Sequence, residues 1–171
     1  MSTKVRPLVH GDRDAVKIIL ENAGNFTSEE IETALELVDE WLSLGEDSGY
    51  LTYVLESTSD PFPIVGYVCF GEAPLTTGTY DLYWIAVDTK HHRGGFGKKL
   101  LKFAEEEIGR RGGRMLLIET SSLETYGGTI SFYERSGYGI AARIKDYYKP
   151  GDDKLIFCKA VGTEQQVTST E

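Results

Sequence analysis

The segment with the clearest chemical use is residues 91–101, HHRGGFGKKLL, where three glycines lie at the start of an apolar helical stripe. Glycine is a poor helix former, so this cluster has a conformational cost. The first N–H groups of a helix have no acceptor within it, and the missing β-carbons let an anion approach them closely. The segment therefore predicts either a plain turn or a phosphate site at the mouth of a helix.

Two common phosphate-binding loops do not fit this segment. A Walker A loop needs glycine at position 92 and serine or threonine at position 99, where the chain has His92 and Lys99. A dinucleotide-binding turn needs glycine at position 100 after Gly95 and Gly97, and Leu100 stands there. Both of these nucleotide-binding patterns are therefore excluded.

The elements that must position this turn follow from hydrophobic periodicity. Residues 79–87 predict a strand that leads into the glycines, and a helix follows to about residue 111. Further strands are expected at 4–9, 49–56, 63–71, 114–122, 138–148 and 153–161, and further helices at 11–24, 27–45 and 124–136. Thr27 and Glu30 form a capping box for the second helix.

This order, β-α-α-β-β-β-α-β-α-β-β, predicts a single mixed α/β domain over residues 1–161. Residues 162–171 form a polar tail that we expect to be disordered. We find no internal repeat and no linker between domains.

Composition limits the location and the partners. The 171 residues are 40% hydrophobic and 26% charged, which is ordinary for one globular domain. No apolar run is long enough to cross a bilayer, and the first twelve residues lack the apolar core of a signal peptide, so we expect a cytoplasmic protein. The net charge of -9 disfavours nucleic acid and anionic membranes as partners and is compatible with a cationic substrate such as an amine.

The metal-binding residue types do not form a recognisable site. Cys69 and Cys158 each lie within an apolar strand-like run and are expected to be buried, reduced thiols. His10, His91 and His92 are not spaced with carboxylates or cysteines as metal ligands. We therefore expect no metal.

Three motifs follow one another along the chain: WIAV at 84–87, HRGGFG at 92–97 and FYERSGYG at 132–139. In this order they resemble the GNAT superfamily of acetyl-CoA-dependent N-acetyltransferases. Residues 92–97, HRGGFG, resemble the pattern Gln/Arg-x-x-Gly-x-Gly/Ala in every fixed place but the first, where His92 stands. The strand ending in WIAV resembles the superfamily's fourth strand, and residues 132–139, FYERSGYG, resemble its second motif. The resemblance covers residues 4 to about 160 and implies a twisted mixed sheet that opens between its fourth and fifth strands.

The resemblance also implies how acetyl-CoA binds. Its peptide-like pantetheine arm would pair with an open strand edge, where a backbone N–H would polarise the thioester carbonyl. That edge consists of Ile85, Ala86 and Val87. The pyrophosphate would lie on the glycine turn, which comprises Arg93, Gly94, Gly95, Phe96, Gly97 and Lys98, with His92 as a further phosphate contact. Tyr126 occupies the place where many members carry asparagine and is another candidate contact.

Acetylation of an amine needs a base, because an alkyl amine with a pKa of about 10 is mostly protonated at neutral pH. Asp81 lies eleven residues before His92, the spacing of a catalytic glutamate in histone-acetylating members, and is the candidate base. Glu119 on the neighbouring strand is the competing carboxylate. Residues 81, 83, 85 and 87 are expected to share one strand face, which would bring Asp81 close to the coenzyme edge.

Tyr133 is the candidate acid for the departing thiolate. The superfamily often places a tyrosine here, on a helix that faces the thioester sulfur. The alternative is plain core packing, because Tyr126, Ile130 and Tyr133 would share one helical face.

The acceptor is left open by the sequence. Tyr147 and Tyr148 resemble the paired tyrosines of members that acetylate protein N-termini, but such pairs also close small amine pockets or belong to ordinary hairpins. The helix at 27–45 is expected to form part of the acceptor wall.

Two classes of function therefore stand. One is an N-acetyltransferase that moves the acetyl group of acetyl-CoA to a small amine or a peptide N-terminus by direct attack. The other is a non-catalytic GNAT-like module that binds acyl-CoA as a sensor or interaction partner. The oligomeric state is also open, a homodimer included.

Overall fold

The structure, a computed structural model, describes residues 2–59, 64–92 and 94–162 of the 171-residue chain. Its strands are β1 (Thr3–Pro7), β2 (Leu51–Ser57), β3 (Ile64–Glu72), β4 (Thr79–Val87), β5 (Met115–Ser121), β6 (Gly139–Lys149) and β7 (Asp152–Ala160). Its α-helices are α1 (Arg13–Ala23), α2 (Ser28–Leu44), α3 (Phe96–Arg110) and α4 (Gly127–Arg135). A short 3-10 turn, η4 (Glu124–Tyr126), precedes α4. The predicted order of strands and helices is confirmed.

The strands of the described residues form one mixed sheet in the order β1-β2-β3-β4-β5-β7-β6. Neighbouring strands are antiparallel except β4 and β5, which are parallel. Parallel neighbours need a crossover connection, and α3 provides it. The glycine turn therefore lies at the C-terminal end of β4, as the sequence predicted.

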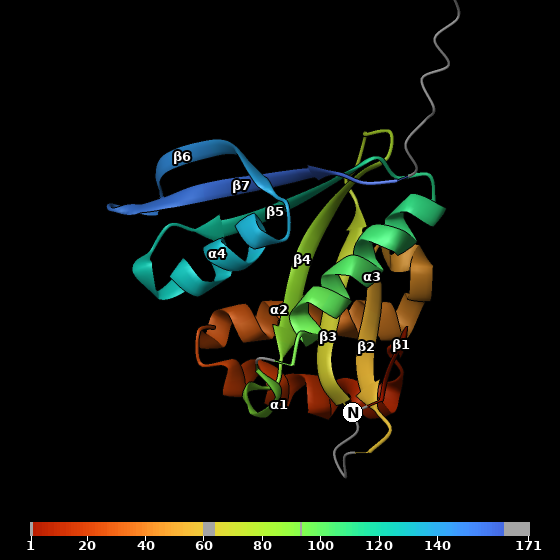
Figure 1. Ribbon diagram of the computed structural model, residues 1–171. Helices are drawn as coiled ribbons and strands as arrows, with labels where there is room; N and C mark the ends of the chain where they lie inside the picture. Colours follow the sequence, from red (N-terminus) through yellow and green to blue (C-terminus); the bar gives the residue numbers. More distant parts are fainter. Residues whose placement is uncertain (1, 60–63, 93, 163–171) are drawn as a thin grey trace, which may run out of the picture.

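Helices cover the sheet from both sides (Figure 1). On one face, α1 and α2 bury a cluster that includes Val16, Ile19 and Val38 against β2, β3 and β4. On the other face, α3 and α4 share a second cluster that includes Leu100 and Tyr133. The capping box of Thr27 and Glu30 is present at the start of α2. Amphipathic helices on both faces give the mixed α/β class that the periodicity predicted.

A β-bulge interrupts β4. Consecutive residues of β3 pair with Trp84 and with Leu82, so Tyr83 is an extra residue between them. Leu82 and Ile85 consequently belong to the same core cluster, although three positions separate them. Asp81, next to Leu82, faces the opposite side. The expectation that residues 81, 83, 85 and 87 share one face is wrong, because the bulge reverses the alternation of a regular strand.

The two central strands separate where the bulge lies. Pairing of β4 with β5 ends at Leu82 and Ile118 among the described residues, although β4 continues to Val87 and β5 to Ser121. A bulge bends its strand and increases the local twist, which accounts for the separation. The predicted opening between the fourth and fifth strands is thus confirmed, and it leaves residues 83–87 with one unpaired edge.

The remaining expectations have mixed outcomes. Both cysteines have free thiols, but only Cys69 is buried. Cys158 is partly exposed because it pairs with Leu117, on the face of β5 opposite the buried Leu116. The end of the domain at residue 161 stays a prediction, since residues 163–171 lie outside the described residues.

Two kinds of feature are absent from the described residues. No helix in this part of the chain is long and apolar enough to cross a membrane. No group of three or more His, Cys, Asp or Glu side chains within it could hold a metal ion.

Candidate active site

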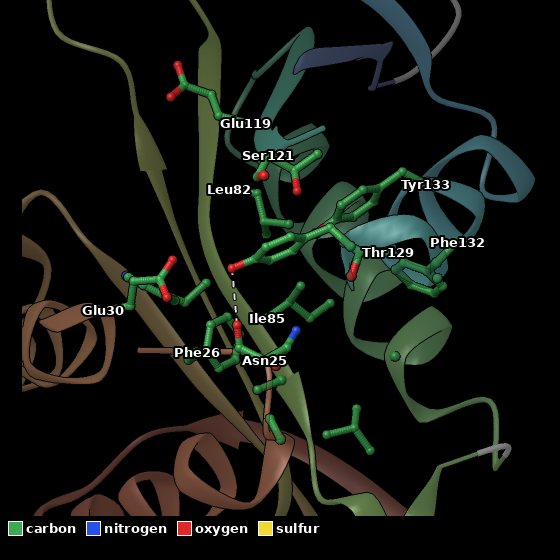
Figure 2. Close-up of a pocket in the computed structure, with 18 of the residues that line it drawn as sticks. Asn25, Phe26, Glu30, Leu82, Ile85, Glu119, Ser121, Thr129, Phe132 and Tyr133 are labelled. Atoms are coloured by element: carbon green, nitrogen blue, oxygen red, sulfur yellow. Dashed lines mark hydrogen bonds between the residues drawn. The ribbon is translucent and has the colours of Figure 1, made fainter. Parts of the chain in front are cut away.

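A cleft of about 1760 Å³ occupies the opening between β4 and β5. Its walls come from residues 81–87 of β4, the start of α3, the end of β5, η4 with α4, and the segment between α1 and α2. In Figure 2, Leu82 and Ile85 of β4 lie between Glu119 above and Asn25 below, with Tyr133 and Phe132 of α4 opposite. The start of α2 contributes Thr27, Glu29 and Glu30, and the expected role of this helix as an acceptor wall stays a prediction.

Nearly all residues predicted from the sequence to bind or react line this cleft; Arg93 lies outside the described residues and Gly94 does not line it. The N–H of Gly94 donates to the carbonyl of His91 at 3.2 Å. A β-carbon at Gly94 would come within 2.6 Å of the Phe96 ring. Gly94 therefore serves the packing of the turn, and its N–H already has an acceptor.

The start of α3 provides N–H groups without helical acceptors. Gly95 precedes the helix with a φ of 74°, a left-handed conformation that favours glycine. The N–H of Lys99 donates to the Gly95 carbonyl at 3.0 Å, so Phe96, Gly97 and Lys98 precede the first helical hydrogen bond. These groups, the helix dipole and the ammonium of Lys98 together favour an anion.

His92 connects the glycine turn to the end of β4. Its Nε2 lies 3.1 Å from the carbonyl oxygen of Val87. A carbonyl only accepts, so Nε2 carries the proton in this contact. The predicted contact of His92 with a phosphate stays a prediction.

Two of the three predicted edge residues direct backbone groups into the opening. The N–H of Asp88 donates to the carbonyl of Val65 at 2.9 Å, so Asp88 faces β3. Backbone groups alternate between the two edges of a strand. Ile85 and Val87 therefore face the unpaired edge, whereas Ala86 faces β3. A peptide-like ligand would find its partners at Ile85 and at the N–H of Val87, because the Val87 carbonyl already accepts from His92.

Asp81 and Glu119 lie on the same sheet face. Asp81 pairs with Leu117 of β5, and Glu119 is two residues further along that strand. Partial burial raises the pKa of Asp81, the charge of Glu119 raises it further, and Lys154 lowers it. Glu119 forms an ion pair with Lys154, with 2.5 Å between Oε2 and Nζ. Within the described residues, Asp81 has no hydrogen-bond or ion-pair partner and is the freer carboxylate.

Tyr133 is buried on the opposite face, with 4% of its surface exposed. Its ring packs against Phe132, Tyr138 and Phe157, with centroid distances of 5.3, 6.0 and 5.7 Å. Burial raises the pKa of its hydroxyl, which therefore stays protonated at neutral pH. Core packing of the ring is thus present, and it leaves the hydroxyl without a hydrogen-bond partner among the described residues.

Tyr126 makes a contact that the sequence did not suggest. Its hydroxyl donates to the backbone carbonyl of Asn25 at 3.1 Å, which is the dashed line in Figure 2. The predicted contact of Tyr126 with the coenzyme stays a prediction. Asn25 and Phe26 were missed altogether, because a short polar stretch between two helices carries no periodic or motif signal.

A comparison with known protein families gives a match over most of the chain. Residues 16–138 match the model of the acetyltransferase (GNAT) family. The chain belongs to the GNAT family. The resemblance seen in the sequence is therefore confirmed, and so, at the level of the family, is the class of enzyme: a GNAT acyltransferase that depends on acetyl-CoA.

Solved structures of other GNAT proteins are similar over most of the chain. One, a protein assigned to the GNAT family from Desulfovibrio desulfuricans, is 39% identical, with a TM-score of 0.88 over 93% of this chain and 99% of that chain. The ribosomal-protein-S18-alanine N-acetyltransferase of Escherichia coli is 21% identical, with a TM-score of 0.75 over 99% of this chain and 100% of that chain. At this identity the second likeness concerns the GNAT fold alone.

A curated relative matches over a shorter length. The S-(2-succino)cysteine N-acetyltransferase of Bacillus subtilis is 32% identical over 69 residues, which are 40% of this chain and 42% of that relative. The GNAT chain thus spans less than half the length of this curated relative.

Proposed function

We propose that this GNAT protein transfers the acetyl group of acetyl-CoA to a primary amine, either a small amine or a peptide N-terminus. The carrying observation is the opening between β4 and β5, to which a free strand edge, a helix N-terminus, a carboxylate and a tyrosine all contribute. The curated relative is named as an N-acetyltransferase, which supports a nitrogen atom as the acceptor of the acetyl group.

The residues present fit acetyl-CoA as a substrate. The N–H groups of Phe96, Gly97 and Lys98 suit the pyrophosphate, because they have no acceptor within the helix. Gly97 has no β-carbon, so the phosphate oxygens can approach the backbone there. Arg135 of α4 lines the same cleft and adds a positive charge. The unpaired edge at Ile85 and Val87 suits the amide groups of the pantetheine arm.

The proton of the attacking ammonium goes to Asp81 in this proposal. Asp81 has a raised pKa and is not held by a cation, whereas Glu119 is paired with Lys154. The free amine then attacks the thioester carbonyl carbon, a C–N bond forms, and the C–S bond breaks. The new amide nitrogen releases its second proton to water, and water returns a proton to Tyr133 after the tyrosine has protonated the thiolate. A backbone N–H of the β4 edge would stabilise the charge that develops on the carbonyl oxygen.

The departing thiolate receives a proton from Tyr133. Its hydroxyl stays protonated because burial raises its pKa, and its ring is held in place by aromatic neighbours. Because packing already fixes the ring, little conformational entropy is lost when the hydroxyl donates its proton.

Release of free thiol from acetyl-CoA tests the proposal. The purified protein is mixed with acetyl-CoA and a panel of alkyl amines and short peptides, and thiol is followed with a chromogenic disulfide. We expect thiol release that depends on at least one amine, with the acetylated product identified by mass. Tight binding of acetyl-CoA without amine-dependent release would instead support the non-catalytic module.

A further inference from the structure

A hydrogen bond crosses the cleft from one wall to the other. Tyr126, in η4 after β5, donates through its hydroxyl to the backbone carbonyl of Asn25, between α1 and α2, at 3.1 Å. The two residues are 101 positions apart, and both line the cleft. We refer to this contact as the Tyr126–Asn25 bridge.

The segment that accepts this bond is itself well anchored. The ring of Phe26 meets the ring of Trp84 on β4 edge to face, with centroids 5.6 Å apart. The N–H of Thr27 donates to the Glu30 carboxylate at 2.7 Å, and the N–H of Glu30 donates to the Thr27 hydroxyl at 3.2 Å. The Asn25 carbonyl is therefore held directly before a ring contact and a helix cap.

The hydroxyl of Tyr126 lies where three elements meet. Its pKa is raised by burial and by the nearby groups Glu30 of α2, Asp152 of β7 and Tyr148 of β6. The hydroxyl therefore remains a donor at neutral pH. Glu30, Asp152 and Tyr148 also line the cleft, so the bridge lies among side chains from three different elements of its wall.

We propose that the Tyr126–Asn25 bridge selects the acceptor, favouring a small primary amine over a peptide N-terminus. In this proposal the continuing chain of a peptide acceptor leaves the cleft between the α1–α2 segment and the β6–β7 hairpin, both of which line it. The bridge joins the α1–α2 segment to η4 across that path. A small alkyl amine has no trailing chain and reaches the opening without displacing the tyrosine.

This inference rests on the proposed amine acetylation, and its test compares two acceptors. The rates of thiol release with n-butylamine and with trialanine amide are measured for the wild type, Tyr126→Phe and Tyr126→Ala. Tyr126→Phe removes the hydroxyl and keeps the ring, and Tyr126→Ala removes both. We expect the ratio of the peptide rate to the amine rate to rise by about tenfold or more in Tyr126→Ala, with a smaller rise in Tyr126→Phe.

Asn25→Ala is the matched control, because it keeps the backbone carbonyl that accepts the bond and should keep the wild-type ratio. Thermal unfolding confirms that each variant is folded. A wild type that acetylates trialanine amide as fast as n-butylamine, or an unchanged ratio in both Tyr126 variants, would overturn the selection alone. If no protein in the set acetylates either acceptor or any member of the panel of amines and peptides, the proposed function fails and the selection with it.

Discussion

Asp81 and Tyr133 lie on opposite faces of the sheet, one on each side of the opening between β4 and β5. Tyr133 belongs to the cluster under α3 and α4, as do Tyr80 and Leu82, the two neighbours of Asp81 in the chain. Asp81 therefore faces the other way. A base on one face and an acid on the other suit a reaction in which the amine and the thioester meet within the opening.

Replacement of the tyrosine tests the acid. Tyr133→Phe should lower kcat by about 10²–10⁴-fold, because general acid help is worth that much and only the hydroxyl is lost. Affinity for acetyl-CoA and the unfolding temperature should stay near those of the wild type, since the ring still packs against Phe157 and Tyr138. Turnover close to that of the wild type, with reduced stability, would leave Tyr133 as a core residue.

The pH dependence of kcat/KM tests the base. A general base works when it is deprotonated, so activity should fall as acid protonates Asp81. Burial and the charge of Glu119 raise its pKa, so this fall should occur above the ordinary aspartate value of about 3.9. Asp81→Asn should lower kcat/KM by about 10²–10⁴-fold at neutral pH and abolish that limb of the profile.

Glu119→Gln is the matched variant for this prediction. It removes the charge that raises the pKa of Asp81 and releases Lys154, which lowers that pKa, so the acid limb should move to lower pH while turnover is retained. A loss of activity as large as that of Asp81→Asn would identify Glu119 as the base instead.

A charged side chain at the start of α3 should block the coenzyme. Gly97 has no positive φ, and a β-carbon there would meet the Phe132 ring at an ordinary 3.5 Å, so Gly97→Glu should fold. Its carboxylate would fill the place of the pyrophosphate and repel its charge. Calorimetry should therefore show that acetyl-CoA binds at least about 100-fold more weakly. Gly11→Glu adds the same charge where a β-carbon meets no atom within 4 Å, and it should bind normally. Equal affinities of the two variants for acetyl-CoA would show that the α3 N-terminus does not bind the coenzyme.

Stability at low pH should depend on Asp12. Burial alone would raise its pKa, but hydrogen bonds from Arg6 and from the Val9 N–H outweigh burial and lower it. A lowered pKa in the folded state means that the stabilisation is present above the unfolded value of about 3.9 and is lost as pH falls through the folded value.

Asp12→Asn should therefore be less stable than the wild type by about 1.5–3 kcal/mol at pH near 7. The difference should shrink in acid, because the wild type then loses the same charge. Urea unfolding at several pH values measures it, and a difference that does not change with pH would show that the carboxylate charge is not what holds β1 to the following turn.

Local patterns in the chain were sufficient to predict much of the framework. Periodicity of apolar residues predicted the strands and helices in their order, and the glycines predicted where the helix N-terminus meets the end of β4. These features depend on residues close together in the sequence. The motif around residues 92–97 also pointed to the family that the comparison then showed.

Three features of the site were decided only by tertiary structure. The bulge at Tyr83 arises from pairing with β3, and it reversed the face expected for Asp81. The ion pair of Glu119 with Lys154 distinguishes two carboxylates that look equivalent in the sequence. The Tyr126–Asn25 bridge joins segments 101 positions apart. Each depends on contacts between distant parts of the chain, and local propensity carries no information about which distant residues will meet.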